Sequence, residues 1–332
     1  MNGQDKIKLA RLEKTVEANY RITRKYAEYL ERYPEFITKE MVDTLTADGD
    51  ITPEEAIVAL LSEAFFLDFD RREDRTLIMD YLTPSVRLFD AEKYRNNPYY
   101  KNVKIKYIKD GSWELRNEKY TAYRGVIAAD MILCDDGREI PPLGFFTEDF
   151  EFPAVLEGGN EWMTLTPVDL DTCDEAIEAA KGRVVTYGLG LGYYAYMVSE
   201  KAEVESITVV EKSPDVIKLF KKHILPQFPN KHKVRVIEAD AFEYAERVSP
   251  AEGYDLAFVD TWRDASDGQP MYEKMKHLEH LSPSTKFMYW IEGFLISRTR
   301  ALRLAELFSK IDSGASDAPD SYDDFIKQMN KV

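Results

Sequence analysis

Cysteine is scarce in this chain: only Cys134 and Cys173 occur among 332 residues. Two isolated cysteines form neither a disulfide framework nor a zinc-binding motif. Histidine is rare as well, with four residues, and His277-Leu278-Glu279-His280 is a short motif that could hold a metal ion. A solvated helix face is the favoured interpretation of this motif, because one His-x-x-His spacing alone does not complete a coordination shell. We therefore expect no metal site.

Long apolar runs are also missing from the sequence. No stretch approaches the roughly 18 apolar residues that a membrane-spanning helix needs. Charged residues begin at Asp5, which leaves no apolar core for a secretory signal. The sequence therefore predicts no membrane partner and a cytoplasmic protein.

Positive charge is in deficit, with 44 Lys and Arg residues against 60 Asp and Glu residues and a net charge of -16. Such a chain repels a phosphate backbone, and the one basic stretch, 218–233, is best interpreted as a solvated helix face and loop. We expect no nucleic-acid partner and a small-molecule substrate. The hydrophobic fraction of 44% and the aromatic fraction of 12% are typical of an ordered globular protein.

The most informative stretch runs from Arg183 to Gly192. A buried-strand pattern there ends in glycines at every second position, and a helix is predicted to begin near Tyr193. A second apolar run follows and ends in Glu211. The succession of strand, glycine loop, helix, strand and carboxylate is typical of sites for adenosine-containing cofactors. Glycine lets the backbone approach the ligand, and the carboxylate can accept both ribose hydroxyls.

Three further strand patterns follow, separated by helical segments, so the sequence predicts a Rossmann-like, doubly wound and mostly parallel α/β sheet. Acidic residues come directly after the third and fourth strands, within 238–242 and 258–262. The carboxyl ends of parallel strands meet at one edge of a sheet, so these acids should converge with the glycine loop. The five predicted strands are 183–187, 206–211, 233–238, 255–260 and 285–291.

The remaining chain is predicted to be helical and then β-rich. Residues 5–33 have one apolar face, and Thr52-Pro53-Glu54-Glu55 has the pattern of a helix start with a capping box. Asp136-Gly137 predicts a hairpin turn, and the aromatic stretch 145–162 is either a lid or core between domains. The predicted parts are an N-terminal helical region (1–96), a β-rich module with an aromatic linker (97–170), a Rossmann-like domain (171–311) and an acidic C-terminal tail (312–332).

Residues 183–291 resemble the class I S-adenosylmethionine-dependent methyltransferases in four ordered elements. The resemblance implies that Glu211 holds the cofactor ribose, that Asp240 recognises the adenine amino group, and that Asp260 to Trp262 face the methionine moiety and the acceptor. Asp260 is also the candidate catalytic base. The cofactor-binding residues implied in this way are Tyr187, Gly188, Gly190, Gly192, Glu211, Lys212, Asp240, Ala241, Asp260 and Trp262.

The sequence departs from this family in three respects. Thr186 stands where many members carry an acid, the Asn-Pro-Pro-Tyr signature is absent, and no sixth or seventh strand is evident after Ile311. The order of a β-rich module and an α/β domain is also similar to spermidine synthases. Their Asp-Ser/Thr-x-Asp-Pro pattern is incomplete here, because Asp260-Thr261-Trp262-Arg263-Asp264 lacks the proline.

The expected function is an S-adenosylmethionine-dependent methyltransferase that acts on a small-molecule or unknown acceptor by direct displacement of the methyl group. The N-terminal helices are expected to shape the acceptor pocket or a homodimer interface. Three alternatives stay open: a spermidine synthase-like aminopropyltransferase, an NAD-dependent oxidoreductase, and a non-catalytic nucleoside-binding protein.

Overall fold

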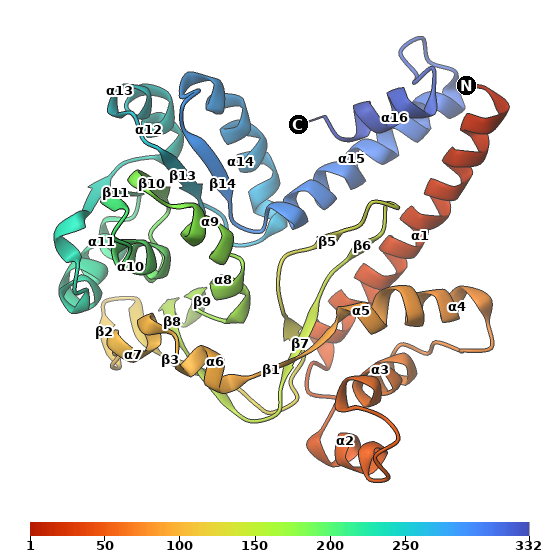
Figure 1. Ribbon diagram of the computed structural model, residues 1–332, viewed down its shortest axis with the longest axis horizontal. Coiled ribbons are helices and arrows are strands. Elements are labelled where there is room, and N and C mark those ends of the chain that lie inside the picture. Colours follow the sequence, from red (N-terminus) through yellow and green to blue (C-terminus); the bar gives the residue numbers. More distant parts are fainter. Residues whose placement is uncertain (332) are drawn as a thin grey trace. The chain divides into compact units, whose positions relative to one another are not determined.

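A computed structural model describes residues 1–331 and divides the chain into two compact units (Figure 1). The helical unit contains Met1–Asp90, Tyr120–Phe150 and the chain from Gly293 onward. The Rossmann-like unit contains Ala91–Lys119 and Glu151–Glu292. The boundaries predicted from the sequence differ from this division, since the β-rich module is shared between the units.

The shared module has a physical explanation in the apolar core of the helical unit. Tyr123, Leu143 and Phe145 are buried there together with Tyr26 and Leu61 from the N-terminal helices. Burial of aromatic and aliphatic side chains is the main stabilising contribution in such a core. A long-range core of this kind leaves no mark in local sequence patterns, so the predicted boundary could not include it.

The helical unit begins with the long helix α1 that the apolar face predicted. The capping box at Thr52 is confirmed: the Thr52 hydroxyl accepts the Glu55 N–H at 3.2 Å, and the Glu55 carboxylate accepts the Thr52 N–H at 2.7 Å. The helices are α1 (Gly3–Arg32), α2 (Lys39–Thr46), α3 (Pro53–Ala64), α4 (Arg72–Leu77), the π-helical turn η1 (Ile78–Leu82), α5 (Thr83–Ser85), α15 (Glu292–Ser313) and α16 (Tyr322–Met329).

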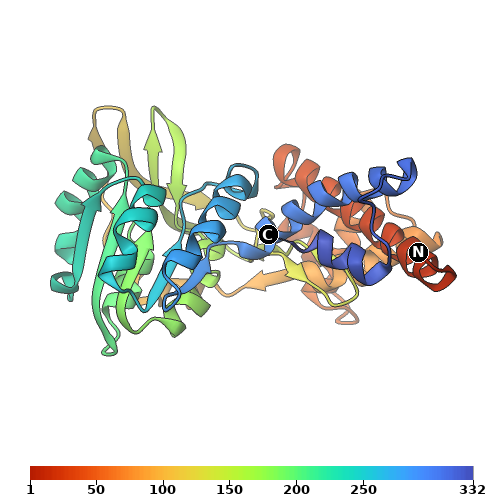
Figure 2. The same ribbon diagram turned by 90° about the horizontal axis from the view of Figure 1, so that it is seen from above.

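The predicted tail contains α16, which packs on α1 (Figures 1 and 2). Leu9 and Leu12 of α1 form a small apolar cluster with Leu307 of α15 and with Phe325 and Met329 of α16. The two ends of the chain therefore belong to the same core.

The strands of the helical unit include the predicted hairpin, which is confirmed: Ile132 pairs with Ile140 in an antiparallel register around Gly137. In the same unit Phe146 is buried between Phe89 and Phe150, with ring centroids 4.9 and 4.3 Å apart respectively. The strands are β1 (Val86–Phe89), β4 (Val126–Ile127), β5 (Ile132–Leu133), β6 (Glu139–Ile140) and β7 (Leu143–Phe146).

The Rossmann-like unit is built on a parallel sheet of five strands in the order β12-β11-β10-β13-β14. The five predicted strands are confirmed, and the order is that of a doubly wound sheet that reverses direction beside β10. The strands are β10 (Gly182–Tyr187), β11 (Val204–Glu211), β12 (Val234–Glu238), β13 (Leu256–Val259) and β14 (Lys286–Tyr289).

Helices connect these strands and cover the sheet (Figure 1). α10 contacts α7 and α9, while α12 contacts α13 and α14. The helices and helical turns are α6 (Ala91–Arg95), α7 (Pro98–Asn102), α8 (Pro167–Asp171), α9 (Asp174–Ala179), α10 (Tyr193–Ser199), α11 (Pro214–Leu219), η2 (Phe220–Ile224), η3 (Leu225–Gln227), η4 (Lys231–Lys233), α12 (Ala241–Arg247), α13 (Ser249–Glu252), α14 (Ala265–Leu278) and η5 (Glu279–Leu281).

A second sheet of four strands, in the order β2-β3-β8-β9, belongs mostly to this unit (Figure 2). Its last strand, β9, brings Trp162 against Trp113 of β3, with ring centroids 5.4 Å apart. The strands are β2 (Ile108–Asp110), β3 (Trp113–Tyr120), β8 (Phe150–Glu157) and β9 (Asn160–Thr164). None of the helices in residues 1–331 combines the length and apolar character needed to cross a membrane.

Candidate functional site

The structure brings the predicted residues to the carboxyl edge of the parallel sheet. Tyr187, the last residue of β10, pairs in register with Val210 of β11 and Val259 of β13. The glycine loop, Glu211 and Asp260 therefore follow three adjacent strands at the same level. Glu238 of β12 pairs with Glu211, which places Asp240 just beyond the end of β12 at the same edge.

Gly188 is required by the close approach of two strand ends. Its backbone has φ +101°, a conformation that favours glycine, and its N–H donates to the Val210 carbonyl at 2.9 Å. A Cβ atom at this position would overlap the Asp260 carbonyl oxygen. The loop after β10 can therefore pass the end of β13 only without a side chain.

Gly190 lies beneath the side chain of Met163, which comes from β9 of the second sheet. A Cβ atom at Gly190 would overlap the Met163 sulfur, the mobile end of a flexible side chain. Met163 therefore covers the glycine loop. A ligand that contacts the loop at Gly190 has to displace the Met163 side chain.

Glu211 is buried, with 7% of its surface exposed, and it fixes the loop around it. One carboxylate oxygen accepts the Leu189 N–H at 3.2 Å, and the other accepts the Ser213 N–H at 2.7 Å. A carboxylate has about four acceptor positions, so two remain for ligand hydroxyls. The residue joins the glycine loop to the start of α11.

Asp240 is the N-cap of α12 and is exposed at the edge of the sheet. One of its oxygens accepts the N–H groups of Phe242 and Glu243 at 2.9 and 3.1 Å, and the other is free of these bonds. Ala241 follows as the first residue of the helix. An exposed carboxylate oxygen at this position remains accessible to a ligand.

The other predicted residues contribute to the site in different ways. The Tyr187 hydroxyl is 2.6 Å from the Ser249 hydroxyl inside the unit, so only its backbone lies at the edge. Lys212 is exposed, and Gly192 is the left-handed N-cap of α10. Trp262 is buried and stacks on Tyr289 with the planes 11° apart. Its indole N–H has no hydrogen-bond partner in residues 1–331.

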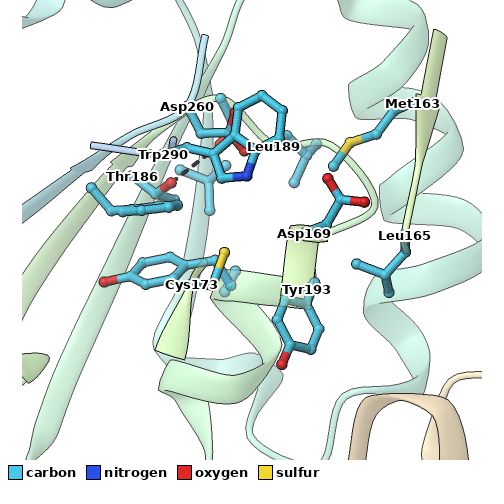
Figure 3. A pocket seen from close by; sticks show the side chains of 14 residues that line it. Met163, Leu165, Asp169, Cys173, Thr186, Leu189, Tyr193, Asp260 and Trp290 are labelled. Atoms are coloured by element: carbon cyan, nitrogen blue, oxygen red, sulfur yellow. Dashed lines mark hydrogen bonds between the residues drawn. The ribbon is translucent and has the colours of Figure 1, made fainter. Parts of the chain in front are cut away.

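A narrow pocket opens beside the glycine loop (Figure 3). The cavity volume is only about 20 Å³, so a nucleoside would need the walls to move apart. The walls combine aromatic and aliphatic side chains with two carboxylates. They are formed by Met163, Leu165, Asp169, Cys173, Thr186, Gly188, Leu189, Tyr193, Tyr194, Ala195, Val209, Phe258, Asp260 and Trp290.

The two carboxylates of the pocket have perturbed acidities. Burial raises the pKa of Asp260 to about 8, and the charges of Asp169 and Glu211 add to this effect. Burial also raises the pKa of Asp169 to about 6, although hydrogen bonds from Thr166 oppose it. Asp169 therefore ionises first, and its charge keeps Asp260 protonated to a higher pH.

Cys173 lies in the same wall, and its chemistry is limited by this environment. Burial, followed by the charges of Asp260 and Asp169, raises the pKa of the thiol well above its ordinary value. A protonated, buried thiol is a weak nucleophile. The acid–base capacity of the pocket therefore resides in the two aspartates.

No motif in the sequence indicates Asp169, Met163 or Trp290 as site residues. A signal for Asp169 existed, because Thr166-Pro167-Val168-Asp169 has the pattern of a capping box, and the structure shows that box at the start of α8. The pattern predicts a helix start, but it does not predict which pocket the aspartate faces.

Replacing Asp260 by Asn is expected to flatten the dependence of stability on pH. The folded protein retains the Asp260 proton that the unfolded chain releases between about pH 4 and 8, so its free energy of unfolding falls as the pH rises through that range. Each pKa unit corresponds to about 1.4 kcal/mol. Urea denaturation at pH 5 and pH 8 measures the effect, with the exposed Asp215→Asn as the control. If the free energy of unfolding changes with pH to the same extent in wild type and Asp260→Asn, the raised pKa of Asp260 is contradicted.

No protein-family model matches the chain, and no curated protein sequence matches it. Solved structures do resemble it. Spermidine synthase from Thermotoga maritima has a TM-score of 0.31 and 13% identity over 47% of this chain and 60% of its own length. This chain therefore spans about 60% of that protein.

Two other solved structures have a similar degree of likeness. A putative O-methyltransferase from Klebsiella pneumoniae has a TM-score of 0.26 and 17% identity over 31% of this chain and 46% of its own. A spermidine synthase in complex with the transition state analogue AdoDATO has a TM-score of 0.30 and 13% identity over 47% and 59%. The layout is Rossmann-like. This assignment rests on the strand order and register of the parallel sheet.

Proposed function

We propose that the chain is a transferase that moves a methyl group from S-adenosylmethionine to a small-molecule acceptor. The observation that carries this proposal is the convergence of the Gly188–Gly192 loop, Glu211, Asp240 and Asp260 at one edge of the parallel sheet. A nicotinamide site would use the glycine loop and Glu211 but does not require the acids after β12 and β13.

The residues present are compatible with the proposed cofactor. Glu211 keeps free acceptor positions for ribose hydroxyls, and Asp240 keeps an oxygen for an amino group. The bound cofactor would supply an activated methyl group on a sulfonium centre. The chain would contribute alignment through the loop and exclusion of water by Met163 and the aromatic walls.

Asp260 is the proposed general base for an acceptor that arrives protonated. Its carboxylate lines the pocket and accepts no hydrogen bond from the residues that the structure describes. The raised pKa, about 8, makes the ionised form a stronger base than an ordinary aspartate. A proton taken from the acceptor would thus be held at the Asp260 carboxylate.

S-adenosylhomocysteine is expected to raise the melting temperature, whereas NAD is not. A ligand present at about 100 times its dissociation constant adds roughly 2.7 kcal/mol to the free energy of unfolding. Differential scanning fluorimetry with both ligands measures the difference. A shift with NAD and none with S-adenosylhomocysteine would favour an oxidoreductase and overturn the methyltransferase proposal.

Aminopropyl transfer is a second candidate, favoured by the charge of the pocket. Asp169 and Asp260 line it, and no Lys, Arg or His does so within residues 1–331. Such a wall suits a donor that has lost its carboxylate. Incubation with each donor and a set of amines distinguishes the two reactions, because methyl transfer releases S-adenosylhomocysteine and aminopropyl transfer releases methylthioadenosine.

A further inference from the structure

The pocket beside the glycine loop contains a carboxylate that neither the sequence pattern nor the resemblance assigns to a role. Asp169 reaches the pocket from α8, a different element from the four that follow the strands. In Figure 3 its carboxylate is directed into the space that Asp260 and Trp290 also border. The pocket is therefore bounded by acids from two independent elements.

The two oxygens of Asp169 have different surroundings. One accepts the Thr166 N–H at 2.7 Å and the Thr166 hydroxyl at 2.8 Å, which anchors the side chain. The other oxygen accepts neither of these bonds. An anchored carboxylate with one unused oxygen is a preorganised acceptor for a cationic donor.

Asp260 supplies an independent observation that points to a ligand. Its side chain is half-buried, lines the pocket, and accepts no hydrogen bond from residues 1–331. A carboxylate that is partly withdrawn from water and has no donor in the protein is open to a cationic ligand. An ammonium group placed between Asp169 and Asp260 would satisfy both.

Thr186 lines the same pocket but carries no charge, and its hydroxyl already donates to the Gly188 carbonyl at 3.3 Å. Negative charge for a ligand in this pocket therefore comes from the two aspartates. Tyr193 and Trp290 provide apolar walls that fit the methylene carbons of an alkyl amine. The pocket therefore suits a ligand that carries a primary ammonium group on a short alkyl chain.

We propose that Asp169 is a specificity-determining residue that binds, together with Asp260, the primary ammonium group of a ligand. The proposal rests on the proposed function for the adenosyl part of that ligand. Two sources share this chemistry: the amine of the cofactor and the amine of an acceptor.

Three matched ligands test the proposal by calorimetric titration of the full chain. Methylthioadenosine has no amine, decarboxylated S-adenosylhomocysteine has the amine alone, and S-adenosylhomocysteine has the amine and a carboxylate. Wild type is expected to bind the decarboxylated ligand at least about tenfold more tightly than methylthioadenosine, the range of a charge-assisted hydrogen bond. Asp169→Asn is expected to remove most of that ratio and to leave methylthioadenosine affinity unchanged.

Two variants control for structural effects. Glu175→Gln removes one negative charge from an exposed position on α9 and should leave the ratio unchanged. Thr166→Ala removes the hydroxyl that anchors Asp169 but retains the carboxylate, so the preference for the amine should persist even if stability falls. An unchanged ratio in a folded Asp169→Asn protein would overturn the proposal and leave Asp169 as a helix cap.

Titration with propane-1,3-diamine, alone and with methylthioadenosine, separates the sources and the two proposals. Asp169-dependent binding of the free diamine assigns the ammonium to the acceptor, whereas an effect confined to the tethered amine assigns it to the cofactor. If methylthioadenosine does not bind but the diamine binds through Asp169, the proposed cofactor is wrong and the amine site stands. If Asp169→Asn changes the affinity of neither the tethered amine nor the free diamine, the proposed amine site is wrong.

Discussion

Gly188→Ala is expected to lower the free energy of unfolding of the Rossmann-like unit by about 3 kcal/mol or more. Alanine at φ +101° is strained by roughly 1–2 kcal/mol, and its Cβ atom would overlap the backbone oxygen of Asp260, which forces the ends of β10 and β13 apart. Thermal unfolding and amide hydrogen exchange of β10 and β13 measure the loss. Binding of S-adenosylhomocysteine should be lost with it.

Gly190→Ala is the matched control for this prediction. The residue also has a positive φ, +52°, but the obstacle to its Cβ atom is the end of the Met163 side chain, which can rotate away. Gly190→Ala should therefore cost less stability than Gly188→Ala. Equal losses in the two variants would show that the contact with Asp260 is not the cause.

Glu211→Ala is expected to weaken S-adenosylhomocysteine binding about ten- to hundredfold, because charge-assisted hydrogen bonds to the ribose are lost. The same variant should also be less stable, since the buried N–H groups of Leu189 and Ser213 lose their acceptor at a cost of about 1–3 kcal/mol each. Binding and stability therefore have to be measured together, by calorimetry and by urea denaturation.

Glu238→Ala provides the control for Glu211. Glu238 pairs in register with Glu211 at the end of the neighbouring strand, but it is exposed. The control should bind S-adenosylhomocysteine and unfold as wild type does. If Glu211→Ala behaves like Glu238→Ala in both measurements, Glu211 is neither a ligand-binding nor a loop-fixing residue.

The fold of the Rossmann-like unit was predictable because its signals are local. Each buried strand is an apolar run bounded by glycine or polar residues, and alternation with helices requires parallel pairing. The helix start at Thr52 was predictable for the same reason, since a capping side chain acts within one turn of its helix. The alternation of apolar side chains with lysines from Val103 to Tyr107 predicts a half-buried strand, but in the structure strand β2 begins only at Ile108.

The contacts of the glycine loop could be predicted only in part from local sequence patterns. The sequence predicted its position and its proximity to Glu211. It did not predict that Gly188 faces the backbone of Asp260, or that Gly190 lies under Met163 of a second sheet. Contacts between distant segments depend on packing, and no spacing rule encodes them.

The parallel sheet, its glycine loop and the acids that follow three of its strands could be predicted from the amino-acid sequence, because parallel pairing places the carboxyl ends of the strands at one edge. Two features depend instead on tertiary packing: Asp169 joins Asp260 in one pocket, and residues 120–150 belong to the core of the helical unit. Both features arise from burial between segments remote in the chain. The free energy of such burial depends on which surfaces pack together, and local propensities do not predict which distant segments those will be.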